Sequence, residues 1–184
     1  SGLATTPAGG YVTVSVIAPD NATTLKDCSI HYAPGGNCNL PPLPASGSYT
    51  VSVNPSGTHA VSLNLTLSAD AAGTLTQNGA AVLFNTARVG QNGRYSFNAT
   101  AGQNLSLLWS GATFAGSSML NVYKPDGSQL RVTTFGTDLP AGTLDLANVP
   151  ASGSYTVFAD PVGTATGQVS LQLLADAAAS LAID

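Results

Sequence analysis

The chain has 184 residues, enough for one large domain or two small ones. Hydrophobic residues make up 43% of it, but charged residues only 8%, against roughly 25% in an ordinary soluble domain, so Ser, Thr, Asn and Gly must keep it soluble. A formal charge of −4 leaves no basic stripe for nucleic acid, and no run approaches the roughly 20 apolar residues of a membrane span, so we expect neither partner.

Residues 1–72 are expected to form a β-sandwich repeat that lacks its first strands. The run Pro44–Val51 returns as Pro150–Val157, which places Tyr155 106 residues after Tyr49. The same offset aligns Pro19-Asp20 with Pro125-Asp126, and no gap is needed. Because residues 79 to about 114 have no counterpart in the first copy, that copy should lack its front third.

Cys28 and Cys38 are the only cysteines, with nine residues between them in a stretch rich in Pro and Gly. In an exported protein this spacing predicts a disulfide, worth roughly 2.5–3 kcal/mol on the chain-entropy view. The gap-free alignment places Thr134 and Leu144 at the equivalent positions, so the bridge would belong to the first copy alone.

Two alternatives for the cysteines remain, namely free thiols and a metal site. Cys28, His31 and Cys38 would need a fourth ligand, and only the distant His59 is available. Calcium would require several oxygens to converge. The aspartates of the Pro-Asp and Asp-Pro turns are expected instead to accept backbone N–H bonds within those turns; they are Asp20, Asp126 and Asp160.

Residues 73–178 are expected to form one complete antiparallel sandwich. Short runs of alternating apolar and polar residues are bounded by turn residues, which is typical of strands with one buried face. The sequence therefore predicts an all-β fold of tandem, jelly-roll-like sandwich modules. Eight strands are predicted, near residues 82–84, 95–97, 105–109, 120–123, 130–132, 143–146, 155–158 and 169–173.

Residues 179–184 are predicted to begin a further repeat. Ala69–Ala72 reads as a linker between copies, and Ala175–Ala178 repeats it. The segment that follows is either the start of a third repeat or a strand that completes a neighbouring molecule; it consists of Ser180, Leu181, Ala182, Ile183 and Asp184.

Three runs, Arg94–Leu107, Leu120–Gly127 and Val149–Val157, together resemble the bacterial pre-peptidase C-terminal domain. They also resemble related tandem modules of large exported bacterial proteins, including those with YD-type (RHS) repeats. The resemblance spans about residues 80–174 and, without the first strands, 10–68. It implies a jelly-roll-like sandwich, export from a bacterium and a non-catalytic accessory or spacer role. Some family members bind calcium or polysaccharide, but neither property is carried over to a residue here.

No combination of residues predicts catalysis. Nucleophilic catalysis needs a base, and the only imidazoles, His31 and His59, do not recur in the second copy, so both are expected at the surface. Glycoside hydrolysis needs paired carboxylates, but there is no Glu and each Asp lies near a turn or a strand end. We therefore expect no enzyme activity.

The leading hypothesis is a secreted or cell-surface structural or adhesive module. It would associate with itself or with neighbouring repeats, and strand complementation could extend it head-to-tail into a filament. The alternative is an accessory domain of a secreted bacterial enzyme that binds a surface glycan or another ligand. Trp109 and Tyr155 are expected in the core, as is Tyr49, which leaves few residues for a sugar platform: Tyr11, Tyr32 and Tyr123.

Overall fold

The chain folds into two all-β units. The computed structural model describes residues 3–6, 9–31 and 36–176. Unit 1 runs from Ser1 to Leu67 and unit 2 from Ser68 to Asp184. In the described part of the chain there is no helix of the length and apolarity that a membrane crossing requires. The boundary falls before the expected linker because residues 71–74 form a strand of unit 2.

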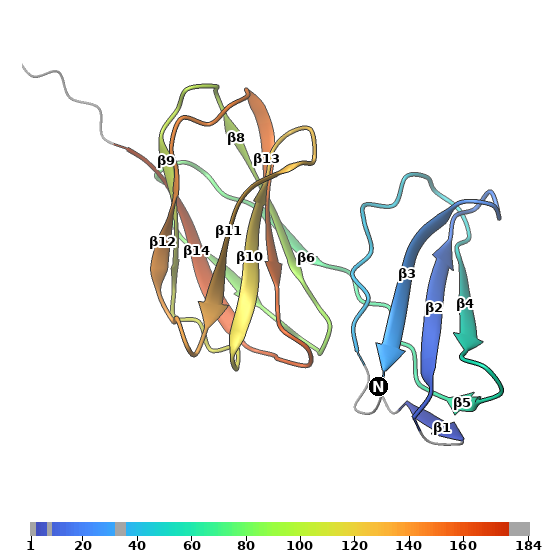
Figure 1. The fold of residues 1–184 in the computed structure, drawn as a ribbon. Helices are drawn as coiled ribbons and strands as arrows, with labels where there is room; N and C mark the ends of the chain where they lie inside the picture. Colours follow the sequence, from blue (N-terminus) through green and yellow to red (C-terminus); the bar gives the residue numbers. More distant parts are fainter. Residues whose placement is uncertain (1–2, 7–8, 32–35, 177–184) are drawn as a thin grey trace, which may run out of the picture. The chain divides into compact units, whose positions relative to one another are not determined.

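Unit 2 is a jelly roll of two sheets (Figure 1). One sheet has the strand order β11-β10-β13-β8-β6, and the other has the order β12-β9-β14-β7. Strands β7 to β14 alternate between the sheets except at the β10–β11 hairpin, which is the arrangement of a jelly roll. All eight lie where the sequence predicts strands: β7 Val82–Asn85, β8 Gly93–Ala99, β9 Leu105–Ser110, β10 Ser117–Tyr123, β11 Gln129–Gly136, β12 Gly142–Leu146, β13 Gly153–Asp160 and β14 Gln168–Ala175.

A ninth strand, β6 (Ala71–Thr74), stands where the sequence indicated a linker. It pairs in parallel with β8 at the edge of the first sheet. The Leu75 N–H donates to the Ser96 carbonyl at 2.8 Å, and the Leu75 side chain is buried. The chain then reaches the other sheet, where the Asn78 N–H donates to the Leu173 carbonyl at 2.8 Å. The segment is therefore part of unit 2.

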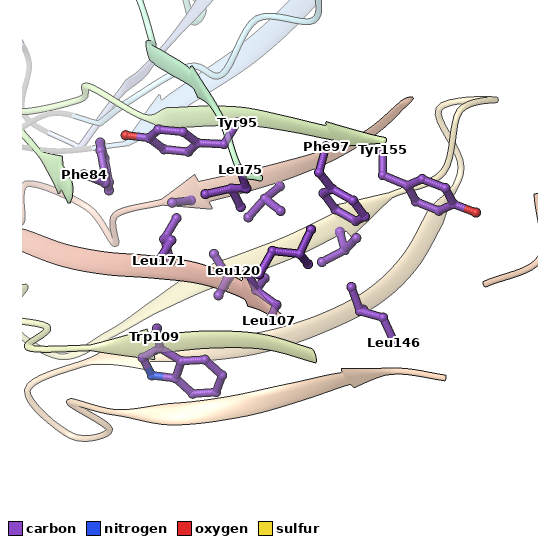
Figure 2. Packing of buried hydrophobic residues seen from close by; sticks show 14 of the residues in the cluster. Leu75, Phe84, Tyr95, Phe97, Leu107, Trp109, Leu120, Leu146, Tyr155 and Leu171 are labelled. Carbon is purple, nitrogen blue, oxygen red and sulfur yellow. The ribbon is translucent and has the colours of Figure 1, made fainter. Parts of the chain in front are cut away.

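The core of unit 2 lies between its two sheets (Figure 2). Alternate residues of β8 and β13 point inward, as the period of two requires. Phe97 of β8 lies beside Tyr155 of β13, with stacked rings whose centroids are 5.2 Å apart. Trp109 is buried, as predicted, and its indole N–H donates to the Leu139 carbonyl at 3.2 Å.

Unit 1 contains a three-stranded sheet with the order β3-β2-β4 and a two-stranded ribbon of β1 and β5. In the repeat alignment, this sheet corresponds to β11-β10-β13 of unit 2. Val14 pairs with Val53, just as Leu120 pairs with Ala159, so the two sheets share one register here. The strands are β1 Ala4–Thr6, β2 Tyr11–Ile17, β3 Thr24–His31, β4 Thr50–Pro55 and β5 Ala60–Ser62.

The core of unit 1 is small because little of the second sheet is present. Residues 36–40, which correspond to β12, are not a strand, and neither are residues 63–69, which correspond to most of β14. Leu3, Val12 and Val14 are buried. The residues packed against them are only partly buried: Ile30, Val53, Val61 and Leu63.

Candidate assembly surface

The recurring Gly-Ser-Tyr motif forms the same local structure in both units. Gly47 has φ 147° and Gly153 has φ 143°, in the region that favours glycine. A Cβ on Gly47 would lie 2.8 Å from Cγ of Pro19, so the motif packs directly on the Pro-Asp turn. The Tyr49 hydroxyl donates to the Ala45 carbonyl at 2.6 Å, as the equivalent tyrosine does in unit 2 at 2.7 Å.

The Pro-Asp turns differ in length by one residue, so the gap-free alignment is wrong at this point. The Ala18 N–H donates to the Thr23 carbonyl, whereas in unit 2 the Lys124 N–H donates to the Ser128 carbonyl. Unit 1 therefore has one extra residue in this turn. Cys28 pairs with Val14 as Thr133 pairs with Leu120, so its structural equivalent is Thr133 rather than Thr134.

Asp20 and Asp126 accept hydrogen bonds within their own turns. The pKa of Asp20 is lowered to about 2, chiefly by a hydrogen bond from the Thr23 hydroxyl and then by the N–H groups of Thr23 and Ala22. The Ser128 hydroxyl and N–H lower the pKa of Asp126. Asp160 is the last residue of β13. Among the described residues, no three His, Cys, Asp or Glu side chains are grouped to hold a metal ion.

The structure joins Cys28 and Cys38 in the expected disulfide, with a Cα–Cα distance of 5.8 Å. The bridge ties the edge strand β3 to the loop that follows it. Because both thiols are consumed, the free-thiol alternative and the metal site with His31 are wrong.

The remaining polar and aromatic candidates that the structure describes are Tyr11, His31 and His59 in unit 1 and Tyr123 in unit 2. The exposed His31 ring lies 5.2 Å from the Tyr11 ring, measured between centroids. His59, expected at the surface, is half-buried, and its Nδ1 lies 2.8 Å from the Ser56 carbonyl oxygen. Tyr123 is half-buried in unit 2. Two predictions, Tyr32 as a sugar contact and 180–184 as an assembly strand, lie outside the described residues.

Unit 1 exposes apolar side chains at positions that unit 2 buries. Val51 is 49% exposed, whereas its equivalent Val157 is fully buried. Leu67 is 84% exposed, whereas its equivalent Leu173 is 1% exposed. Leu65 is 52% exposed, and its counterpart in β14 is fully buried. We call Tyr49, Val51, Val53, Leu65 and Leu67 the unit 1 face.

In unit 2, strands without a counterpart in unit 1 cover these positions. Strand β8 pairs with β13 and places Phe97 opposite Tyr155 and Tyr95 opposite Val157. Strands β7 and β9 flank β14 on either side. The unit 1 face is therefore the place where β7, β8 and β9 would lie in a complete unit.

The β4 edge of the unit 1 sheet lacks the usual protection against strand pairing. Edge strands are commonly blunted by charged side chains, by proline or by bulges. The other edge, β3, contains Lys26 and Asp27, whereas residues 45–69 contain no Lys, Arg, Asp or Glu. Only Pro55, the last residue of β4, limits pairing there. An apolar face beside an uncharged strand edge can accept a further strand.

The sequence matches no protein-family model and no curated protein. Among solved structures, it is similar to the pre-peptidase C-terminal domain of a collagenase from Bacillus anthracis, at 10% identity and a TM-score of 0.41 over 60% of this chain and 99% of that one. It is also similar to PliG of Aeromonas hydrophila, a periplasmic inhibitor of g-type lysozyme (19% identity, TM-score 0.37, 57% of this chain and 99% of that one). The insecticidal delta-endotoxin Cry8Ea1 of Bacillus thuringiensis matches at 9% identity and a TM-score of 0.27, over 88% of this chain and 41% of that one. Values this low assign the chain to no family and to no activity.

Proposed function

We propose that the chain is a non-catalytic extracellular structural module that binds a neighbouring repeat through the unit 1 face. The observation that carries this proposal is the contrast between equivalent residues, above all Leu67 and Leu173. Apolar side chains buried in one copy of a repeat and exposed in the other mark a surface that a partner can cover.

Three further features support a non-catalytic extracellular structural role. A disulfide that ties a small unit together is typical of oxidising compartments. Tandem copies of one β module suit a spacer or a fibre better than a catalyst. The carboxylates of Asp20 and Asp126 accept hydrogen bonds within their own turns.

The predicted assembly strand, Ser180–Asp184, has a defined place in the repeat. Leu181 corresponds to Leu75, which follows β6 and is buried beside β8 in unit 2. Asp176 corresponds to Asp70, whose carboxylate lies 2.9 Å from Nε of Arg94 in β8. Both sides of β8 in unit 2 are occupied, by β13 and by β6. We propose that this segment pairs, as β6 does, with a β8-type strand whose edge is free, and not with β4.

The test is the mass of the chain in solution across concentration, measured by sedimentation. We expect the wild-type chain to associate as concentration rises. A variant with Val51→Thr, Leu65→Thr and Leu67→Thr should remain monomeric because its face is polar. The matched control changes three exposed residues of unit 2, Leu83→Thr, Val132→Thr and Val162→Thr, and should associate like the wild type.

A wild-type chain that stays monomeric at every concentration would contradict self-association. If the control variant lost association as well, the unit 1 face would not be the contact. Deletion of residues 180–184 tests the role of that segment. If association survives the deletion, the segment takes no part in the assembly.

A further inference from the structure

We infer that the occupant of the β4 edge is a β8-type strand, antiparallel to β4 and in one defined register. This inference rests on the proposed role of the unit 1 face and names the partner's chemistry. The partner is an extended segment of a neighbouring repeat, with aromatic side chains at alternate positions and small ones flanking them, as in Gly93, Tyr95, Phe97 and Ala99.

The register follows from the shared geometry of the two sheets. Strands β2 and β4 pair in the same register as β10 and β13. In unit 2, β8 adds to the free side of β13. Transferred to unit 1, the incoming strand places the residue equivalent to Phe97 opposite Tyr49 and the one equivalent to Tyr95 opposite Val51.

The acceptor side is already formed in unit 1. Tyr49 is held by its hydroxyl at the Ala45 carbonyl, just as Tyr155 is held at the Ala151 carbonyl. In unit 2 the held tyrosine stacks on Phe97 with ring centroids 5.2 Å apart (Figure 2). Unit 1 thus presents one half of this aromatic pair on a half-buried side chain.

Strand chemistry also defines what the partner must lack. Val51 and Val53 would lie beside the inward-pointing side chains of the partner strand. A charged residue at one of these inward positions of the partner would therefore lose water without gaining a counter-ion. The outward position of Arg94 is different, because its guanidinium carbon lies 4.5 Å from the centre of the Phe158 ring in unit 2. The equivalent of Phe158 in β4 is Ser52, so unit 1 offers no such ring and does not require arginine there.

The experiment titrates the full chain into a fluorescent peptide with the sequence of residues 92–101 and follows anisotropy. We expect saturation at one peptide per chain. The change Val51→Asp should weaken binding by about tenfold or more, because the carboxylate would lie opposite the peptide's Tyr95 and lose part of its hydration. Val132→Asp is the matched control, an exposed valine on an edge strand of unit 2, and should leave affinity within about twofold.

Two measurements keep the test valid if Val51→Asp disturbs unit 1. A peptide with Phe97→Ser and Tyr95→Ser leaves the chain untouched and should lose binding. A photoreactive benzoylphenylalanine at the Phe97 position of the peptide should cross-link to the segment around Tyr49. Cross-links within unit 2 would overturn the inference, because they would show exchange with the resident β8.

The outcomes separate this inference from the proposed function. If the chain associates with itself but ignores the peptide, assembly stands and the β8-type partner is wrong. If the peptide binds at β4 and the chain alone stays monomeric, the inference stands and self-association is wrong. Absence of binding, or binding that Val51→Asp leaves unchanged, overturns the inference.

Discussion

At the scale of single residues, the repeated motifs recur because they contact one another. The proline of each Pro-Asp turn packs against the glycine of Gly-Ser-Tyr, where a Cβ would lie 2.8 Å from Cγ of Pro19 in unit 1 and 3.0 Å from Cγ of Pro125 in unit 2. The tyrosine hydroxyl then closes the preceding loop by donating to an alanine carbonyl and accepting from the N–H of the same alanine. Two short sequences far apart in each copy are therefore one structural element.

Tyr49 and Tyr155 allow the contribution of the same hydroxyl hydrogen bonds to stability to be compared between the two units. Tyr155→Phe should destabilise unit 2 by about 1–2 kcal/mol, because the partly buried Ala151 groups lose their partner. Tyr49→Phe should cost unit 1 less than about 0.5 kcal/mol, because water can replace the hydroxyl at the exposed Ala45. Calorimetry of both variants, with one transition assigned to each unit, measures the difference. Equal losses would mean that the two loops are equally buried.

At the scale of elements, one stretch of the repeat forms a complete strand in unit 2 but not in unit 1. Residues 62–69 and 168–175 are aligned copies, yet only the second forms a strand along its whole length. In unit 2 that strand lies between β7 and β9, which supply its hydrogen bonds, and its apolar side chains are buried in the core between the two sheets. Alternation of apolar residues is therefore necessary but not sufficient for a strand.

The leucines of these copies test this directly. Leu173→Ala should destabilise unit 2 by about 2–5 kcal/mol through loss of a fully packed side chain. Leu67→Ala should change the stability of unit 1 by less than about 0.5 kcal/mol, because little is packed against it. Urea unfolding followed by circular dichroism gives both values. A large loss for Leu67→Ala in the monomer would show that the unit 1 face is covered within the chain.

The sequence predicts the eight strands of the jelly roll because each has clear alternation and is bounded by turn residues. It misses β6, since Ala-Ala-Gly-Thr carries neither alternation nor β-branched residues until its end, and its strand character comes from pairing with β8. The extra turn residue is also missed, because hydrogen bonds rather than identities reveal it. The disulfide is predictable from spacing, whereas the unit 1 face needs the comparison of burial between the two copies.

At the scale of the whole molecule, the two units differ in how they are stabilised. Unit 2 has a continuous core between two sheets, whereas unit 1 combines a small core with a covalent bridge. Small units that bury little apolar surface commonly depend on such a bridge. The disulfide is therefore found in the unit with the smaller core.

Removal of the bridge should affect one unit alone. The double variant Cys28→Ser, Cys38→Ser should lower the stability of unit 1 by about 2.5–3 kcal/mol, since the unfolded chain regains the freedom of a closed loop. The transition of unit 2 should not move. Calorimetry of the variant beside the oxidised chain measures both transitions. A shift in the unit 2 transition would show that the units unfold as one.

The bridge also has a mechanical consequence. If the chain carries tension between its ends, rupture of unit 1 extends every residue except the nine enclosed between Cys28 and Cys38. At about 3.5 Å per extended residue, roughly 30 Å of contour length stays withheld while the bond is intact. The chain with the disulfide intact therefore extends less under tension than the reduced chain, in which these nine residues also extend.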